Sequence, residues 1–313
     1  MRAMALYVML QNTVYLLNVF THIAVHRVRT LNENACLYPY IRQGGYIMGV
    51  SSPLFTLYRA HRTWVRNHIF TNLNALLNGV PPLDDDHVDQ ALQRYGGGYC
   101  HEMNTRFAHL LAAQGISVHF MGAYVYNPDN PPATIASHTI LQVTLNGVPL
   151  LCDVGFGKGF LWPIRLDRLG CVQHQGTLTY RVIKPAGRYV LQQLEKGHWL
   201  EMYAFDPQKT SAQIVSECNI YSATSPNSPF TGNLLVTHYQ RGSGRHTLFN
   251  TRYKRTPTDN HPVIITSMQR LDECLRQAFG IQLNPEEIKR VFAVCKAAER
   301  ERKSALAQRR AAK

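Results

Sequence analysis

Apolar residues recur at helical spacing through the first part of the chain. Residues 54–79 follow this pattern and end in an Asn-Gly pair, which predicts one or more helices. Two prolines come next, and Asp84, Asp85 and Asp86 then favour the start of a short helix. A further helix is predicted to begin near Cys100 and to end at a glycine. This part of the chain is therefore predicted to be helical.

The pattern changes at Ile116. Short runs of β-branched and aromatic residues, separated by turn residues, continue to about residue 205 and predict an antiparallel sheet or barrel. The remainder starts with a turn-rich segment and continues with strand-like runs and two helices, at 267–280 and 284–306. Asn284 suits the N-cap of the last helix because a proline follows it. Helices, then strands, then mixed elements predict an α+β fold.

The first fifty residues fit neither pattern. The stretch from Met4 to Val25 has no Asp, Glu, Lys or Arg, but polar residues interrupt its apolar positions. It is a poor match to a membrane span, which needs about 20 predominantly apolar residues, and no clear cleavage site of a signal peptide follows it. We interpret 1–50 as an atypical N-terminal segment that is buried or loosely packed. A membrane anchor and an incorrectly assigned start are the alternatives.

The composition sets the size of the core and the charge. The 313 residues are 45% hydrophobic, which is enough for one large domain or for two or three that share a core. The net charge of +13 is concentrated in part at 289–313, which contains nine Lys or Arg and two Glu. We interpret this tail as a solvated, partly helical end, although such tails also bind nucleic acid or membranes. No nucleic-acid-binding motif occurs, so neither partner is expected.

Seven cysteines are spread along the chain, and no two form a Cys-x-x-Cys pair. An odd number at wide spacing argues against a disulfide framework and against a zinc site, so no metal is expected. Free thiols are typical of a reducing compartment, which predicts a cytoplasmic protein.

One of these cysteines has an unusual setting. The sequence GGGYC places Cys100 after three glycines and a tyrosine, at the predicted start of a helix. The positive end of the helix dipole and the free backbone N–H groups favour a thiolate there, and the thiolate is the nucleophilic form. We interpret the glycines as opening an approach to the sulfur, and the tyrosine as packing to anchor the turn. A buried structural cysteine after a glycine turn is the alternative.

A predicted β-hairpin brings two further candidates together. Two strand-like runs are joined by an Asn-Gly pair, a strong signal for a two-residue loop in which Leu145 faces Val148. In that register His138 lies diagonally across from Asp153. A carboxylate beside an imidazole fixes its tautomer and stabilises its charged form, so these two residues and Cys100 would complete a Cys-His-Asp triad. Spacing alone leaves open whether the hairpin meets the helix; a histidine satisfied within the sheet is the alternative.

The context of these three residues resembles the arylamine N-acetyltransferase family. That family carries Arg-Gly-Gly-Tyr-Cys before a helix, a His in a following strand, and an Asp in Asp-Val-Gly-Phe-Gly. In the same order, this chain has Gly97-Gly98-Tyr99-Cys100, Ser137-His138 and Asp153-Val154-Gly155-Phe156-Gly157. The resemblance covers roughly residues 55–280. The chain lacks the insertion typical of vertebrate members, so it is similar to bacterial or fungal ones.

The chain also departs from the family pattern. Gly96 stands where relatives have Arg, and Arg94 lies two residues earlier. Thr71 replaces a Glu of an early family segment. His101 stands where an aromatic or aliphatic residue is usual, and a second imidazole so close to Cys100 is expected to perturb the thiolate.

The resemblance implies an architecture. It implies a helical first domain at 51–115 that carries the cysteine, after the atypical segment 1–50. An antiparallel β-barrel second domain at 116–205 would carry the His and the Asp, and an α/β domain at 206–313, ending in the basic helical tail, would act as a lid.

The resemblance also implies a reaction. Acetyl-CoA would acetylate Cys100, and an arylamine, arylhydroxylamine or hydrazine would then accept the acetyl group in a ping-pong mechanism. His138 would relay the proton, and Asp153 would orient the imidazole. Acetyl-CoA is thus the expected co-substrate, and small-molecule amines and CoA are the expected partners. The alternatives are a transglutaminase-like or peptidase-like enzyme or an amide synthase that uses the same triad, and a catalytically degenerate family member.

Candidate binding residues follow from the same motifs. The cleft between barrel and lid would hold acetyl-CoA, with Phe156 as the matching aromatic residue of Gly-Phe-Gly. Ser137, Gly155 and Gly157 are the other candidates for substrate or CoA binding.

Overall fold

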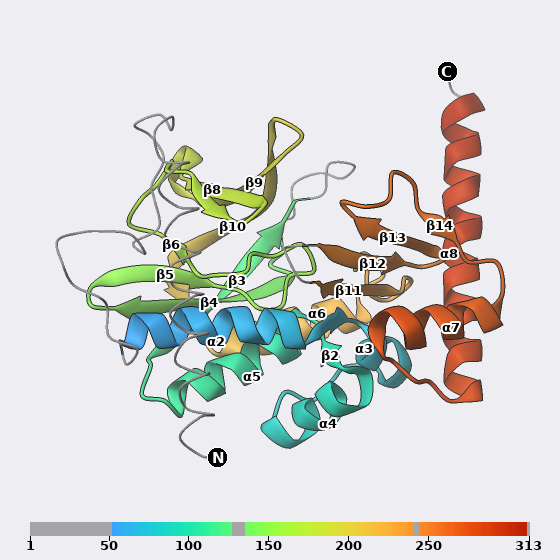
Figure 1. Ribbon diagram of the computed structural model, residues 1–313, viewed down its shortest axis with the longest axis horizontal. Coiled ribbons are helices and arrows are strands. Elements are labelled where there is room, and N and C mark those ends of the chain that lie inside the picture. Colours follow the sequence, from blue (N-terminus) through green and yellow to red (C-terminus); the bar gives the residue numbers. More distant parts are fainter. Residues whose placement is uncertain (1–51, 127–134, 241–243, 312–313) are drawn as a thin grey trace, which may run out of the picture. The chain divides into compact units, whose positions relative to one another are not determined.

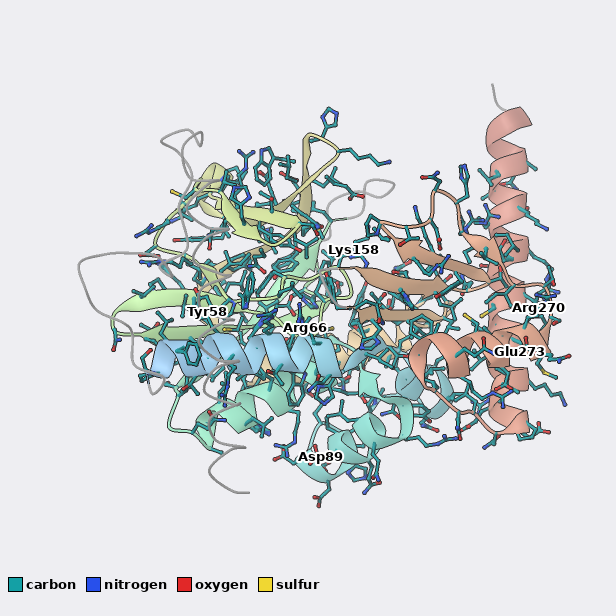
Figure 2. All side chains as sticks on the ribbon, in the orientation of Figure 1. Tyr58, Arg66, Asp89, Lys158, Arg270 and Glu273 are labelled. Carbon is teal, nitrogen blue, oxygen red and sulfur yellow. The ribbon has the colours of Figure 1, made fainter. Side chains whose placement is uncertain are left out.

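The computed structural model describes residues 52–126, 135–240 and 244–311, and the interpretations of segment 1–50 lie outside them. The first described helix, α2 (Pro53–Asn67), begins where Ser52 Oγ accepts a hydrogen bond from the N–H of Phe55, with a proline in the first turn. Its inward face buries five residues at helical spacing: Leu57, Tyr58 (labelled in Figure 2), His61, Trp64 and Val65.

The predicted helical stretch is interrupted after α2. A short strand, β1 (Ile69–Thr71), separates α2 from α3 (Leu73–Asn78). Strand β1 pairs in parallel with β2 (Gly97–Gly98) and antiparallel with a strand from the C-terminal part of the chain. The strand has a partner on each edge, and this non-local pairing overrides the helical pattern of the sequence around it.

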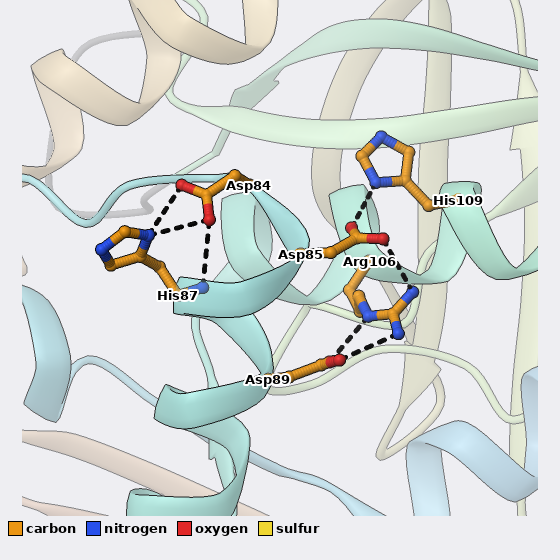
Figure 3. A network of polar contacts seen from close by, with 6 residues as sticks. All are labelled: Asp84, Asp85, His87, Asp89, Arg106 and His109. Carbon is orange, nitrogen blue, oxygen red and sulfur yellow. Dashed lines mark hydrogen bonds and ion pairs between the residues drawn. The ribbon is translucent and has the colours of Figure 1, made fainter.

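Two further helices follow as predicted. These are α4 (Asp85–Tyr95), capped by Asp84, and α5 (Cys100–Ala112). Figure 3 shows how α4 is fastened to α5. Arg106 forms a bidentate ion pair with Asp89 at 2.6 and 2.9 Å, and a third bond to Asp85 at 3.2 Å, which also pairs with His109.

The predicted antiparallel sheet has eight strands in the order β6-β5-β4-β3-β10-β9-β8-β7 (Figure 1). Its two end strands are joined through glutamine side chains. Gln173 of β7 bonds with both the N–H and the carbonyl of Arg165 in β6, and Gln175 bonds with the backbone of Leu161 and Trp162. The sheet is therefore a nearly closed barrel. Its strands are β3 (Val118–Val125), β4 (His138–Leu145), β5 (Val148–Cys152), β6 (Ile164–Arg165), β7 (Gln173–Gln175), β8 (Leu178–Ile183), β9 (Tyr189–Glu195) and β10 (His198–Thr210).

A second sheet has six strands in the order β14-β13-β12-β11-β1-β2, so it joins strands from both ends of the described chain. Helices α7 and α8 pack against it, and α8 is capped by Asn284, whose Oδ1 accepts from the Glu287 N–H at 2.9 Å as the sequence predicts. The remaining elements are α6 (Gln213–Thr224), β11 (Leu235–Tyr239), β12 (Arg245–Phe249), β13 (Arg252–Thr256), β14 (Val263–Ile264), α7 (Met268–Phe279) and α8 (Pro285–Ala311), with a short 3-10 turn at Pro185–Gly187.

Separate apolar clusters hold these layers together. One lies between α2, α5 and the first strands of the barrel, one fills the barrel, and one lies between the six-stranded sheet and helices α7 and α8. The predicted α+β fold class is confirmed. Among the described residues, no helix is long and apolar enough to cross a membrane.

Candidate active site

Helix α5 begins at Cys100, as predicted, with Tyr99 at its N-cap. The first turn is held from two sides: the Tyr99 N–H donates to Glu102 Oε2 at 3.1 Å, and Asn74 Nδ2 donates to Glu102 Oε1 at 2.7 Å. Tyr99 is fully buried, and its hydroxyl donates to Asn219 Oδ1. The tyrosine therefore anchors the turn by a hydrogen bond as well as by packing.

The glycines before Cys100 allow close packing of the backbone. A Cβ atom on Gly97 would lie 1.7 Å from the carbonyl oxygen of Ile69 in β1, and one on Gly98 would lie 2.7 Å from Glu102 Oε2. Cys100 itself is only 1% exposed. Because glycine has no side chain, Gly97 and Gly98 leave room for strand β1 and for the Glu102 carboxylate. The structure thus gives the glycines a packing role, whereas the sequence suggested an approach for the substrate.

The hairpin has its predicted register. Asn146 and Gly147 both have positive φ, as a two-residue loop requires, and β4 and β5 pair as expected. His138 is the first residue of β4, and Asp153 directly follows β5. The imidazole Nε2 lies 2.7 Å from Asp153 Oδ2, and both side chains are buried. The predicted His-Asp pair is therefore present.

Hydrogen bonds surround the carboxylate of Asp153. Its Oδ1 accepts from Asn104 Nδ2 and from the Gly155 N–H, both at 3.0 Å, and its Oδ2 also accepts from the Tyr203 hydroxyl at 3.1 Å. Burial raises the pKa of this carboxyl group, but the charge and hydrogen bond of the neighbouring imidazole, with these other donors, outweigh it and leave the pKa lowered. The carboxylate therefore stays ionised inside the protein.

A second histidine supports Asp153 from behind. The Asp153 N–H donates to His61 Nε2 at 3.2 Å, and His61 Nδ1 lies 3.1 Å from the carbonyl oxygen of Leu161. Burial lowers the pKa of His61 to about 4, so the ring is neutral at neutral pH. One nitrogen then donates to Leu161 and the other accepts from Asp153, so a single tautomer satisfies both bonds.

The thiol and the imidazole favour each other's charged forms. Burial raises the pKa of Cys100, but interactions with His101 and His138 more than offset this and lower it below the ordinary thiol value. Burial lowers the pKa of His138, while Asp153 and Cys100 raise it, and the balance lies above the ordinary imidazole value. These mutual effects favour a thiolate beside an imidazolium, with the Asp153 carboxylate hydrogen-bonded to the ring.

The other buried thiols have the opposite tendency. Burial raises the pKa of Cys152. Burial also raises the pKa of Cys218 and the pKa of Cys295, each to about 12. No histidine contributes to the pKa of any of these three thiols. Among these buried cysteines, Cys100 is thus the one whose surroundings favour the nucleophilic form.

Two of the four predicted binding residues, Phe156 and Gly155, lie against His138 and Cys100. The Phe156 ring centroid is 5.0 Å from that of His138, and the Phe156 ring is only partly buried. A Cβ on Gly155 would lie 2.6 Å from the Cα of Cys100, so this glycine lets its loop lie against the start of α5. A Cβ on Gly157 would lie 3.3 Å from the Phe70 side chain, and the Ser137 carbonyl oxygen accepts a hydrogen bond from Ser222 Oγ.

The sequence analysis assigned no role to Asn104, Tyr203 or His61. Asn104 lies four residues after Cys100, on the same face of α5, so helical spacing could have identified it. Tyr203 in β10 and His61 in α2 are remote in sequence, and no local signal marks them. Arg94, two residues before the family's usual arginine position, does not take part in the site; its guanidinium pairs with Glu287 at 2.6 Å.

The described residues contain no group of three or more His, Cys, Asp or Glu that could hold a metal ion. The side chains gathered around Cys100 are an imidazole and a carboxylate, and a thiol with these two partners has the groups that covalent acyl transfer uses.

Comparison with known proteins agrees with this geometry. A family model described as N-acetyltransferase matches residues 53–288. The chain is 30% identical over 240 residues to an arylamine N-acetyltransferase / N-hydroxyarylamine O-acetyltransferase of Salmonella typhimurium, with 74% of this chain and 82% of that protein covered.

Solved structures show the same fold. The arylamine N-acetyltransferase of Mycobacterium abscessus superposes with a TM-score of 0.72 at 26% identity, over 78% of this chain and 89% of that one. The enzyme of Mycobacterium marinum in complex with CoA gives a TM-score of 0.70 at 26% identity, over 78% and 94%. The chain therefore belongs to the arylamine N-acetyltransferase family of acyltransferases.

Proposed function

We propose that the protein transfers the acetyl group of acetyl-CoA to arylamines, arylhydroxylamines or hydrazines through an acetyl-Cys100 intermediate. The observation that carries this proposal is the His138–Asp153 pair beside Cys100, the one buried thiol among the described residues whose pKa is lowered. The complex of a relative with CoA supports acetyl-CoA as the donor. The Salmonella relative's name supports arylamines and N-hydroxyarylamines as acceptors.

The first half-reaction acetylates the enzyme. His138 Nε2 is engaged by Asp153, so Nδ1 is the ring atom left to face the thiol. The Cys100 thiolate attacks the thioester carbonyl, the bond from that carbon to the CoA sulfur breaks, and the imidazolium gives its proton to the leaving thiolate. Backbone N–H groups in the first turn of α5, including that of Cys100, would stabilise the oxyanion.

The second half-reaction restores the thiolate. The amine attacks the acetyl carbon, His138 takes the proton that the nitrogen loses, and the bond from carbon to the Cys100 sulfur breaks to release the amide. The thiolate and the imidazolium are then re-formed. Phe156, partly exposed beside His138, would hold the aromatic ring of the acceptor, with Ser137, Gly155 and Gly157 shaping the surrounding wall.

The domain roles follow from this chemistry. The segment 51–115 would supply the nucleophile, 116–205 the base and its carboxylate, and 206–313 the lid that closes over acetyl-CoA. A cytosolic co-substrate and six free cysteines among the described residues are in keeping with a cytoplasmic enzyme, which is the location we propose.

Intact-mass measurement tests the proposal. Mixing the protein with acetyl-CoA should add one acetyl group per chain, and an arylamine should then remove it with formation of the N-acetyl product. Absence of the adduct, or its transfer to water at the same rate with and without amine, would contradict the proposal.

A further inference from the structure

The residue after the proposed nucleophile is buried and has polar partners on both sides of its ring. His101 is completely buried, and each of its ring nitrogens faces a hydroxyl group. Nδ1 lies 2.8 Å from Thr139 Oγ1 in β4, and Nε2 lies 2.9 Å from Ser222 Oγ in α6. The edge of the ring also contacts Tyr99, with ring centroids 4.8 Å apart. One side chain thus links α5 to two other elements.

Those two hydroxyl groups lead to both neighbours of His138. Thr139 follows His138 directly in β4. Ser222 Oγ donates to the carbonyl oxygen of Ser137, the residue before His138, at 3.1 Å. The residue next to Cys100 is therefore bonded, directly or through one hydroxyl, to the residues on either side of the imidazole.

The direction of these bonds follows from the number of protons. The Ser222 hydroxyl has one proton, which it donates to Ser137, so it accepts from His101 Nε2. The Thr139 hydroxyl can donate to Nδ1 of a neutral ring or accept from a protonated one. The bonds therefore persist in either charge state of His101, and the linkage survives when the thiol loses or gains its proton.

We propose that His101 is a positioning residue for the acetyl transfer: through Thr139 and Ser222 it fixes the first turn of α5 relative to His138, so that the Cys100 sulfur faces the imidazole. The inference rests on the proposed function.

The test replaces the imidazole while keeping an aromatic ring. In His101→Phe, the pH midpoint of Cys100 alkylation by iodoacetamide should rise by about one unit or more. The rate constant of acetylation by acetyl-CoA in a single turnover should fall about tenfold or more, with little change in the acetyl-CoA concentration that saturates it. His109→Phe makes the same substitution on the same helix at an exposed site and should leave both quantities unchanged.

Further variants separate the linkage from packing. Thr139→Val and Ser222→Ala keep the imidazole but remove its partners, and each should slow acetylation; they carry the test if His101→Phe does not fold. His101→Gln restores a donor and an acceptor, so it should recover part of the lost rate.

Two outcomes would overturn the inference: wild-type midpoint and acetylation rate in folded His101→Phe, or unchanged acetylation in both hydroxyl variants. Failure of the wild-type protein to form an acetyl-enzyme would instead refute the proposed function, and the alkylation midpoints would still decide whether His101 holds Cys100.

Discussion

The chemistry of Cys100 depends on a few buried groups that change each other's charge. The thiol and the imidazole of His138 are each buried, and burial alone would keep both neutral. Together they offset that cost, because a thiolate and an imidazolium stabilise each other and Asp153 adds a fixed negative charge behind the ring. Removing one member therefore alters the protonation of the others.

The assignment of the nucleophile can be tested with two buried cysteines. Cys100 is the first residue of α5, and Cys152 is the last residue of β5 in the hairpin. Cys100→Ser should abolish acetyl transfer, since a serine hydroxyl is not ionised by this histidine at neutral pH. Cys152→Ser is the control: Cys152 is buried on β5 with a raised pKa, so it should retain activity despite some loss of stability. Steady-state arylamine acetylation measures both, and equal loss in the two variants would refute the assignment.

The proposed ion pair of Cys100 and His138 makes a prediction about pH. A lowered pKa means that Cys100 is already a thiolate below the usual thiol range, so its alkylation rate should stay high at neutral pH and fall only under acidic conditions. A free thiol would lose reactivity as the pH falls through roughly 8.5. His138→Ala removes one stabilising charge, so the midpoint should move to higher pH. An inflection near the free-thiol value in the wild type, or an unmoved midpoint in the variant, would exclude the pair.

Local structure was predictable where short-range signals decide it. The Asn146-Gly147 loop fixed the register of β4 and β5, and that register placed His138 diagonally across from Asp153. The start of α5 followed from the glycines and the apolar pattern after them. Strand β1 could not be predicted, because three residues carry too little periodicity and its partners, β2 and β11, are distant in the sequence.

The pairing of β1 with β2 yields a prediction about the turn that leads to Cys100. Gly97→Ala would place a methyl group 1.7 Å from the Ile69 carbonyl oxygen, so the two strands must separate. We expect a loss of at least about 2 kcal/mol in the free energy of unfolding, together with a loss of acetyl transfer. Gly232→Ala is the matched control, because a Cβ there meets nothing within 4 Å. Urea unfolding measures the difference, and equal stability of the two variants would be inconsistent with this packing.

At the scale of the whole molecule, the resemblance predicted more than the residue pattern did. Motifs in order identified the family and the fold class. They did not show that Gln173 and Gln175 join the ends of the barrel sheet, or that β1 and β2 complete a sheet with the C-terminal strands. Such contacts depend on which surfaces meet after folding, and an isolated glutamine or a three-residue strand carries no sequence signal of its partner.

Competition between water and amine for the acetyl-enzyme is a property of the whole cleft. Phe156 lies on the barrel side, with its ring 5.0 Å from that of His138, and we propose that residues 206–313 close over it. If they limit water and hold an aromatic acceptor, the acetyl-enzyme should persist with acetyl-CoA alone and discharge rapidly on addition of an arylamine. Varying both substrates should then give parallel double-reciprocal lines, because the two half-reactions are separate.

The Phe156 ring provides the variant for this prediction. Phe156→Ala removes the surface for the acceptor but leaves the thiol, the imidazole and the carboxylate in place, so arylamine acetylation should fall further than acylation by acetyl-CoA. Rapid-quench measurement of each half-reaction gives the two rate constants separately, and the Phe156→Leu variant, which keeps apolar bulk without the ring, tests whether aromaticity matters. Release of CoA well beyond one equivalent by the wild-type enzyme without any amine would show that water reaches the thioester freely. In that case the protein would act as a thioesterase, and the barrel and the C-terminal part would not form the closed cleft that transfer to an amine requires.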